Sequence, residues 1–264
     1  MIIKRFFGEL SRLLGLARGK KKKTNPIKYR RLELSAKLDR MLKSTVKYGP
    51  FKGLKLTPQS WWGSTDKGSM LLGMYEKELL DSLVSVPKKY KTFIDLGAAD
   101  GYYGVGVLVN DLFERSYCFE MSEKGRQVIR RNAKLNMVSG RVSIYGKADK
   151  DFYKTLKNVE LDKSVLFIDI EGAEFDLLDR DTLQAFSQSI IFIELHDWFF
   201  KDGQRRLKRL YDDVPHTHHL TEMTTTSRNP SEFEELRRFN DTDRWLVCSE
   251  GRGRLMTWLR LDPK

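Results

Sequence analysis

Two short runs of almost uninterrupted apolar residues, at positions 164–170 and 190–195, restrict the fold of this chain most strongly. A strand that is apolar on both faces needs cover on both faces, and parallel sheets with helices on each side provide it. From Tyr90 onwards, helical patterns alternate with short apolar runs of this kind. The alternation predicts a doubly wound, mainly parallel α/β sheet.

The expected strands occupy residues 92–96, 116–120, 141–145, 164–170 and 190–195, followed by a closing pair at 244–249 and 255–259. The closing pair flanks a glycine-rich turn signal, Gly251-Arg252-Gly253, which predicts an antiparallel addition at one edge of the sheet. The helices expected between the strands occupy residues 104–112, 123–136, 175–186 and 203–212.

The region before residue 89 has a different pattern. Helical periodicity at 28–47 and 70–84 encloses an irregular segment at 48–64 that is rich in glycine, proline and tryptophan. We therefore expect a basic amphipathic extension at 1–25, a helical and irregular region at 26–88 that packs on the core, and the α/β domain at 89–264.

The net charge of +12 is concentrated at the N-terminus, because residues 1–31 carry +10 and the other 233 residues about +2. Residues 1–17 predict a short amphipathic helix, and lysines fill positions 20–23. Apolar residues beside a lysine cluster favour contact of residues 1–23 with an anionic membrane surface. A solvated tail and a helix packed on a partner are the alternatives.

Cys118 and Cys248 provide neither a disulfide framework nor a CxxC metal pair, which favours a reducing compartment. The sequence shows no signal-peptide pattern, and no run reaches the roughly 18 apolar residues that a membrane span needs. We expect a cytoplasmic protein that its basic arm could hold at the inner face of the membrane.

A glycine-containing loop follows the expected strand at 92–96, in the segment FIDLGAADGYYG at residues 93–104. Gly97 and Gly101 permit unusual backbone angles and a close approach of a ligand to the main chain. Ligands of doubly wound sheets bind beyond the carboxyl ends of the strands. Glu120 ends the next strand, where an acid can accept hydrogen bonds from a ribose diol. Loop and acid together predict a nucleotide-type ligand.

The spacing within the loop separates two such ligands. A dinucleotide loop reads GxGxxG, and here Ala99 and Tyr102 occupy the second and third glycine positions. Asp95 stands two positions before the first glycine, where a carboxylate repels pyrophosphate but suits a ligand with an amino group and a sulfonium. The pattern DxGxxxG is that of class I methyltransferases, so the predicted cofactor is S-adenosylmethionine. A glycine-rich turn in another α/β protein is the alternative.

Three segments, DLGAADGYYG, FIDIEGAEFDLL and IIFIELH, resemble the FkbM-type family of O-methyltransferases over residues 71–261. Members typically show DxGANxGxY, then DxEGxE on the fourth strand and an ELH-like end to the fifth. Ala99 departs from this pattern, because the family usually has Asn there. The resemblance implies a seven-stranded Rossmann-like methyltransferase sheet with an antiparallel edge and an N-terminal helical extension, and makes 89–264 the class I methyltransferase domain.

The resemblance also extends the expected cofactor site. Glu76, in the segment GMYEKEL, resembles a residue that helps to close the cofactor pocket, with an exposed helical Glu as the alternative. By position after the third strand, Lys147-Ala148-Asp149 is where an adenine would lie. The predicted cofactor-binding residues are Asp95, Gly97, Ala98, Gly101, Tyr103, Glu120, Met121, Ala148, Asp149, Asp169 and Glu76.

Methyl transfer to a hydroxyl needs an oriented acceptor and a group that takes its proton. The candidates follow the fourth and fifth strands: Asp169, Glu171, Glu194 and His196. Histidine titrates near neutral pH and suits this role, although His196 could instead be a half-buried structural residue. Glu171 and Glu174 could simply favour the first turn of the next helix.

The same four candidates, Asp169, Glu171, Glu194 and His196, form a donor set that a hard divalent cation accepts, but no spacing demands one and we predict no metal. A solvated loop is the expected setting of His216, His218 and His219, with metal binding as the alternative. Trp61 and Trp62 could form an acceptor platform or pack on the core. Arg252 and Arg254 could bind a phosphate or carboxylate on the acceptor, or they could simply belong to a basic hairpin turn.

These features predict an S-adenosylmethionine-dependent methyltransferase that acts on a hydroxyl of a glycan, a glycolipid or a small metabolite. A nucleic-acid methyltransferase is the first alternative, supported by the basic arm and opposed by the nearly neutral core. A non-catalytic, membrane-associated protein with a methyltransferase fold is the second, and the retained Asp95, Gly97, Gly101 and Glu120 oppose it.

Overall fold

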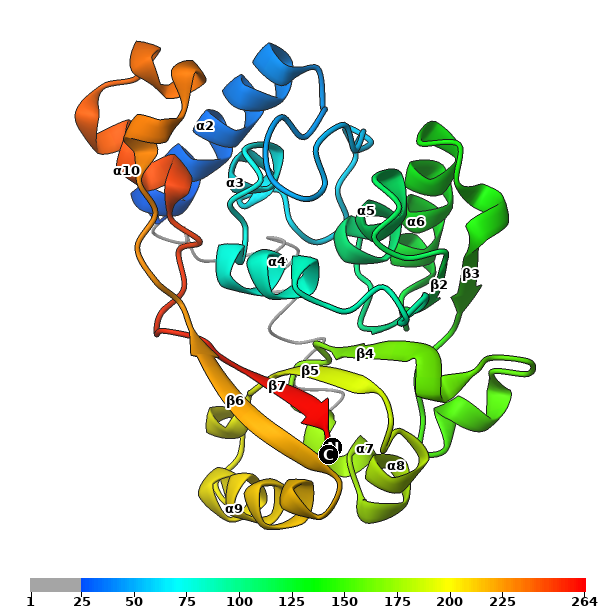
Figure 1. Cartoon of the computed structure of the whole chain (residues 1–264). Helices are drawn as coiled ribbons and strands as arrows, with labels where there is room; N and C mark the ends of the chain where they lie inside the picture. Colours follow the sequence, from blue (N-terminus) through cyan, green and yellow to red (C-terminus); the bar gives the residue numbers. More distant parts are fainter. Residues whose placement is uncertain (1–24) are drawn as a thin grey trace, which may run out of the picture.

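The computed structural model describes residues 25–264, so the predicted helix at 1–17 and the basic arm at 1–23 lie outside the described residues. One seven-stranded sheet has the order β3-β2-β1-β4-β5-β7-β6 (Figure 1). The first five strands are parallel, and β7 is antiparallel to both β5 and β6, which confirms the predicted fold class. The strands are β1 Thr92–Leu96, β2 Arg115–Phe119, β3 Val142–Tyr145, β4 Ser164–Ile168, β5 Ile190–Glu194, β6 His218–Thr224 and β7 Thr257–Pro263.

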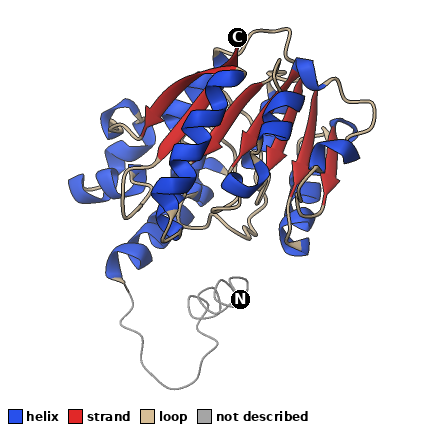
Figure 2. Ribbon diagram, turned by 90° about the horizontal axis from the view of Figure 1, so that it is seen from below, coloured by secondary structure: helices blue, strands red, loops and turns tan. Residues whose placement is uncertain are grey.

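Helices cover both faces of the sheet, as the ribbon in Figure 2 shows. Alternate residues of one strand belong to different cores: Phe167 packs with α4, α5 and α6, and Leu166 packs with α7, α8 and α9. This period of two explains the continuous apolar runs, since both faces of each central strand are buried. The helices are α4 Lys77–Val84, α5 Tyr102–Val109, α6 Glu123–Leu135, α7 Glu174–Leu177, α8 Arg180–Ala185 and α9 Gly203–Asp213.

A third apolar cluster joins the beginning of the described chain to a late segment. Helix α2 (Pro26–Leu42) packs against α3 (Lys67–Leu71) and α10 (Asp241–Cys248), and Leu38 and Val247 meet in this cluster. Asn25 caps α2, because its Oδ1 accepts the Ile27 N–H at 3.0 Å, and Pro26 fits the first helical turn. The segment before β1 is thereby tied to the C-terminal part of the chain.

The sheet changes direction at β1. The chain leaves β1 towards β2 and β3 on one side, then crosses to β4 and β5 on the other. Such a switch point opens a crevice beyond the carboxyl ends of the two central strands. The glycine loop after β1 and the acids after β4 therefore meet at the same place.

The closing pair of strands was predicted incorrectly at 244–249. Residues 244–248 belong to helix α10 and Ser249 follows it, and β6 at His218–Thr224 pairs with β7 instead. A short apolar run such as WLVC fits a strand and a helix equally well by periodicity. The deciding signal is Asn240, whose Oδ1 accepts the Asp243 N–H at 2.8 Å and caps the helix.

Two predicted helices are interrupted. Residues 70–84 divide into α3 and α4, because Gly73 and Glu76 both have left-handed backbone angles, with φ of 66° and 49°. Residues 175–186 divide into α7 and α8, because Asp179 starts a new helix by accepting the Thr182 N–H at 2.9 Å. The predicted helix at 28–47 is α2, which ends at Leu42. No helix in the described part of the chain is both long and apolar enough to cross a membrane.

Replacing the cap of α10 tests whether this segment is the helix that the structure shows. Asn240→Ala should lower the free energy of unfolding by about 1 kcal/mol, since the first-turn N–H groups lose their acceptor. Urea unfolding measures the change. Thr242→Ala, at an exposed position in the first turn, is the matched control and should cost less; equal losses would contradict the assignment.

Candidate active site

The loop after β1 is pressed against the end of β4. Gly97 has φ of 91°, and a Cβ built on it would lie 1.8 Å from the Asp169 carbonyl oxygen. The Asp169 N–H also donates to the Leu96 carbonyl at 3.0 Å. Only glycine combines this backbone angle with this contact, so the first glycine of the motif is required by packing as well as by any ligand.

Glu120 holds the loop from the other side. Its two carboxylate oxygens accept the Ala99 N–H at 2.9 Å and the Ser122 N–H at 2.6 Å. Burial raises the pKa of Glu120, although these backbone hydrogen bonds oppose the shift. The predicted ribose acid therefore also fixes the loop geometry, and lone pairs of its oxygens remain for a ligand.

Ala99 has a left-handed backbone, with φ of 47°. Asparagine and glycine adopt this conformation more readily than alanine does. This explains in physical terms why the resembling family usually has Asn at this position. The departure at Ala99 costs backbone energy without changing the course of the loop.

Asp95 lies at the floor of the crevice and is 2% exposed. Its Oδ2 is buried without a hydrogen-bond partner. Burial, and then the negative charge of Glu120, raise the pKa of Asp95 to about 8. A buried carboxylate oxygen without a partner is costly, and a ligand with a cationic donor would satisfy it.

The pocket in front of Asp95 brings together many of the predicted cofactor residues. Sequence reasoning missed Asp100, which accepts the Trp61 N–H at 2.9 Å and so holds the tryptophan segment at the pocket. Trp62 lines the pocket with half-exposed indole, while Trp61 does not line it. The lining residues are Trp62, Gly63, Met70, Tyr75, Glu76, Asp95, Gly97, Ala98, Ala99, Asp100, Tyr102, Tyr103, Phe167 and Asp169.

Glu76 is not an exposed helical residue. It is 4% exposed, precedes α4 with a left-handed backbone, and accepts a hydrogen bond from the Tyr103 hydroxyl at 2.6 Å. Burial, and then the nearby Glu194, raise the pKa of Glu76 to about 8. The structure thus places Glu76 in the wall of the pocket, and its contact with a cofactor stays a prediction.

Other predicted cofactor residues lie at the same edge of the sheet but outside this pocket lining. Met121 follows β2 and is 57% exposed. Asp149 follows β3 and pairs with Lys147 at 2.8 Å, and Ala148 is half-buried beside the α7–α9 core. Gly101 begins α5 and packs beside Ile129. Their contact with a cofactor stays a prediction.

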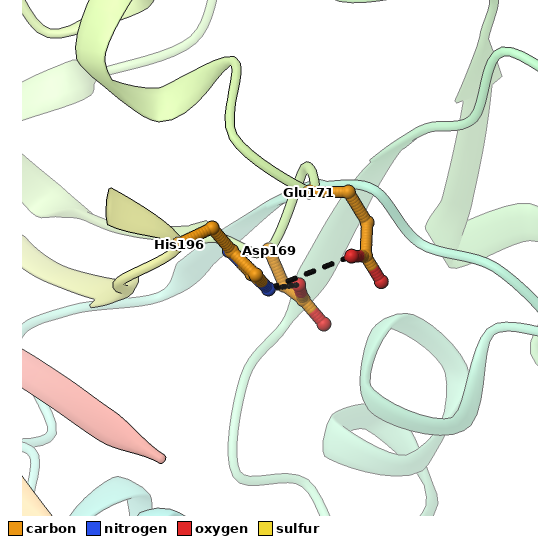
Figure 3. A group of neighbouring side chains, drawn as sticks. All are labelled: Asp169, Glu171 and His196. Atoms are coloured by element: carbon orange, nitrogen blue, oxygen red, sulfur yellow. Dashed lines mark ion pairs between the residues drawn. The ribbon is translucent and has the colours of Figure 1, made fainter. Parts of the chain in front are cut away.

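The four predicted catalytic residues form one cluster, of which Figure 3 draws Asp169, Glu171 and His196. His196 Nε2 lies 3.4 Å from Glu194 Oε2, 3.6 Å from Glu171 Oε2 and 3.9 Å from Asp169 Oδ1. Asp169 also lines the cofactor pocket, so the cluster and the pocket are adjacent. The tips of β4 and β5 therefore bring the four candidates together, and their part in catalysis stays a prediction.

Ionisation within this cluster is coupled. Burial raises the pKa of both Asp169 and Glu194 well above the usual range, and the charge of Glu171 adds to the shift of Asp169, as the charge of Asp169 adds to that of Glu194. Burial alone would lower the pKa of His196, but the carboxylates of Glu174, Glu194 and Glu171 outweigh it and raise the value. In the free protein the cluster therefore retains protons that an exposed set of the same groups would lose.

Glu174 positions the cluster. It is fully buried in the first turn of α7, where its oxygens accept the Gly172 N–H at 2.8 Å and the His196 N–H at 2.9 Å. The carboxylate therefore ties the β4 loop to the tip of β5. This contact is more specific than the helix-end role weighed from the sequence.

Arg252 is neither a hairpin turn residue nor a free anion site. Its guanidinium forms ion pairs with Glu76 and Glu194, and Nε donates to Glu250 at 2.8 Å. Arg254 lies over the Trp198 ring, with its guanidinium carbon 4.4 Å from the ring centroid. Sequence reasoning missed Glu250, because only the fold brings these charges together.

The predicted histidine loop is partly strand. His218 is buried in β6, where Nδ1 lies 2.7 Å from the Thr217 hydroxyl and Nε2 lies 3.1 Å from the Ser189 carbonyl. His216 precedes the strand and His219 belongs to it. Within residues 25–264, the residues spaced closely enough to share a metal ion are Asp169, Glu171 and His196. His216, His218 and His219 do not form such a group.

The loop geometry leads to a prediction for Ala99. Ala99→Asn should raise the free energy of unfolding by about 0.5 to 1 kcal/mol, since asparagine adopts the left-handed conformation more readily. Ala99→Val is the matched variant and should lower it, because a β-branched residue is least suited to this conformation. Urea unfolding of the three proteins decides; a loss of stability with Asn would contradict the strain at this position.

Comparison with known proteins gives one family and several distant structures. Residues 149–240 match the Methyltransferase FkbM domain, a segment that begins after the glycine loop and includes the Asp169, Glu171, Glu194 and His196 cluster. No curated protein matches the sequence significantly.

Three solved structures illustrate the distant similarity. TrmK of M. capricolum, in complex with S-adenosyl-homocysteine, has 11% identity and a TM-score of 0.47, with 72% of this chain and 70% of that chain covered. An O-methyltransferase from Bacillus cereus in complex with SAH has 12% identity and a TM-score of 0.45, with 97% of both chains covered. The putative tRNA (m1A22) methyltransferase Sp1610 of Streptococcus pneumoniae has 14% identity and a TM-score of 0.45, with 72% and 71% covered.

The similarity of these structures to the chain is limited to a distant likeness of fold. The class of protein is indicated by the family match. It includes the segments DIEGAE and ELH on which the resemblance was based. The resemblance to the FkbM-type methyltransferase family is thereby confirmed by a match of residues 149–240 to the Methyltransferase FkbM domain.

Proposed function

We propose that this protein is an S-adenosylmethionine-dependent methyltransferase that methylates a hydroxyl group of a glycan, a glycolipid or a small metabolite. The observation that carries the proposal is Asp95 Oδ2, a buried carboxylate oxygen without a partner at the floor of the glycine-loop pocket. An ammonium group of the cofactor would provide the missing donor. The FkbM domain match supports the methyltransferase class.

The residues around Asp95 fit this cofactor. Gly97 lets the loop backbone approach a ligand closely, and Glu120 lies at the tip of β2, where it can accept from a ribose. Tyr103 and Glu76 form the opposite part of the pocket wall. Asp169 continues the wall towards the cluster that would face the acceptor.

When bound, S-adenosylmethionine supplies a methyl carbon activated by a sulfonium. The pocket in front of Asp95 would hold this cofactor, which would give its methyl group to the acceptor oxygen and leave as S-adenosylhomocysteine. The cluster of Asp169, Glu171, Glu194 and His196 would take the proton that the hydroxyl loses. The protein orients the two reactants and takes one proton, which are the contributions that methyl transfer requires.

A second pocket supports a hydroxylated acceptor. Its volume is about 560 Å³, within the range of about 300 to 1,000 Å³ typical of small-ligand sites. Hydroxyl-bearing Thr225, Thr226 and Ser227, together with the half-exposed indole of Trp245, form part of its lining. Arg252 also lines it and contacts Glu194 of the cluster, so the pocket adjoins the proposed reaction centre.

The charge distribution favours such an acceptor over a nucleic acid. Beyond residue 31 the chain carries only about +2, whereas phosphate contacts dominate the affinity of nucleic-acid enzymes. A screen with a labelled methyl donor against glycans, hydroxylated metabolites and RNA tests this preference directly. Labelling of RNA alone would overturn the proposed acceptor class. The membrane contact of residues 1–23 stays a prediction.

Neutralising Asp95 should weaken cofactor binding. Asp95→Asn should reduce the affinity for S-adenosylhomocysteine about 10- to 100-fold, since a hydrogen bond to a charged group contributes about 1.5 to 3 kcal/mol. Isothermal titration measures the affinity. Asp81→Asn, at an exposed acid that pairs with Lys77 on α4, is the matched control and should bind normally. Equal affinity in all three proteins would remove Asp95 from the site.

The raised pKa of Asp95 gives the same binding a pH dependence. A cationic ligand prefers the ionised carboxylate, so below the pKa of about 8 the affinity should fall as pH falls, up to tenfold per unit. At pH 7, binding should release a proton to the buffer. Titrations in buffers of different ionisation enthalpy measure this release, and Asp95→Asn should eliminate it. Persistence of the release in that variant would assign it to another group.

His196 should affect turnover and not cofactor binding. His196→Ala removes a group from the proton-accepting cluster, so turnover should fall about 100-fold or more with an acceptor found in the screen. The affinity for S-adenosylhomocysteine should change less than threefold, because His196 does not line the cofactor pocket. Full activity of the variant would remove His196 from the chemistry.

A further inference from the structure

The spacing within the acidic cluster is unusual for groups that contact only one another. His196 Nε2 lies 3.4 to 3.9 Å from oxygens of Glu194, Glu171 and Asp169, beyond the usual hydrogen-bond length of about 2.7 to 3.2 Å. Ligand atoms of Asp169, Glu171 and His196 lie within 4.8 Å of one another. Figure 3 shows the His196 ring directed at the carboxylates of Asp169 and Glu171.

A shared cation produces this spacing. Metal–ligand distances of about 2.1 Å place neighbouring ligand atoms of an octahedral or tetrahedral ion about 3.0 to 3.4 Å apart. The separation of 3.4 Å is at the upper end of this range, and those of 3.6 and 3.9 Å exceed it. Small side-chain rotations would therefore bring all of these atoms to a common centre.

A buried atom without a partner points into the same space. Asp169 Oδ1, the oxygen that faces His196 Nε2, is buried and has no hydrogen-bond partner. His196 itself is only 3% exposed, and its Nε2 is directed at the carboxylates of the cluster, whereas its Nδ1 faces Glu174 on the other side of the ring. Native proteins rarely leave such a buried group unsatisfied, and a ligand is one of the recognised explanations.

The charge of the cluster matches a dication. Arg252 pairs with Glu194, but in the described part of the chain no lysine or arginine nitrogen lies within 4.0 Å of Asp169 or Glu171. Two carboxylates thus lack a basic partner and face one imidazole. One divalent cation would neutralise both, where a buried like-charge pair is otherwise unfavourable.

The surrounding backbone supports the arrangement. Glu171 has φ of 53°, a left-handed conformation that non-glycine residues adopt at a cost and that concentrates at functional sites. Glu174 Oε1 lies 3.4 Å from His196 Nδ1, which favours a proton on Nδ1 and leaves the Nε2 lone pair directed at the cluster. Ligating histidines typically have such a carboxylate behind them.

We propose that Asp169, Glu171 and His196 bind one hard divalent cation of the Mg²⁺ and Mn²⁺ class, with Glu194 beside them as a further oxygen donor. Carboxylate-rich donor sets favour these ions. Because Asp169 also lines the cofactor pocket, the cation would lie next to the methyl donor. Its role in catalysis rests on the proposed function: it would lower the pKa of the acceptor hydroxyl, and a carboxylate of the cluster would take the proton in place of the ligated His196.

The test uses the full chain, treated with a chelator and exchanged into metal-free buffer. Titration with Mn²⁺, followed by the EPR signal of the free ion, should show one bound equivalent. Pulsed EPR of the complex should show coupling to a ¹⁴N nucleus. Glu171→Gln should weaken binding at least tenfold, and His196→Ala should also remove the nitrogen coupling.

Asp176→Asn is the matched control, because this acid on α7 is exposed and pairs with Arg206. It should bind Mn²⁺ like the unaltered protein, and circular dichroism checks that every variant is folded. Absence of a stoichiometric site, or unchanged binding in both cluster variants, would overturn the proposal. Titration with S-adenosylhomocysteine separates the two claims: cofactor binding without Mn²⁺ binding rejects only the cation, and Mn²⁺ binding without cofactor binding rejects only the methyltransferase function.

Discussion

The contact between Gly97 and the Asp169 carbonyl is the constraint on which the site depends. β1 and β4 are neighbours at the point where the sheet changes direction, and their following loops have no space for a Cβ between them. The contact sets the loop backbone, which Glu120 then fixes from the far side. As a result Asp95 and Asp169 line one pocket, and the proposed cofactor site adjoins the proposed reaction centre.

Excess negative charge is the second organising feature. Carboxylates at the ends of β4 and β5 share a largely buried region with Glu76 and Glu250, and Arg252 is the basic residue that links Glu76, Glu194 and Glu250. Such a region folds only if protons or bound cations offset the burial of charge. The acidity that is costly for the free protein is therefore suited to cationic ligands.

Much of the fold and of the candidate site was predictable from the sequence, because ligand-binding residues of a doubly wound sheet lie at the carboxyl ends of its strands. The positions of Asp95, Glu120 and His196 follow from where their apolar runs end. Helix α10 was missed because a short apolar run does not distinguish strand from helix. The partners of Arg252 were unpredictable, since Glu194 and Glu76 lie 58 and 176 positions away and no local pattern records such contacts.

Arg252 also has a consequence for how the two reactants influence each other. One guanidinium contacts the wall of the cofactor pocket through Glu76, the reaction centre through Glu194, and the larger pocket directly. A ligand that moves the Arg252 guanidinium towards one of these carboxylates weakens its ion pairs with the others. Donor and acceptor would then bind with a coupling free energy, and each would change the affinity for the other by the same factor.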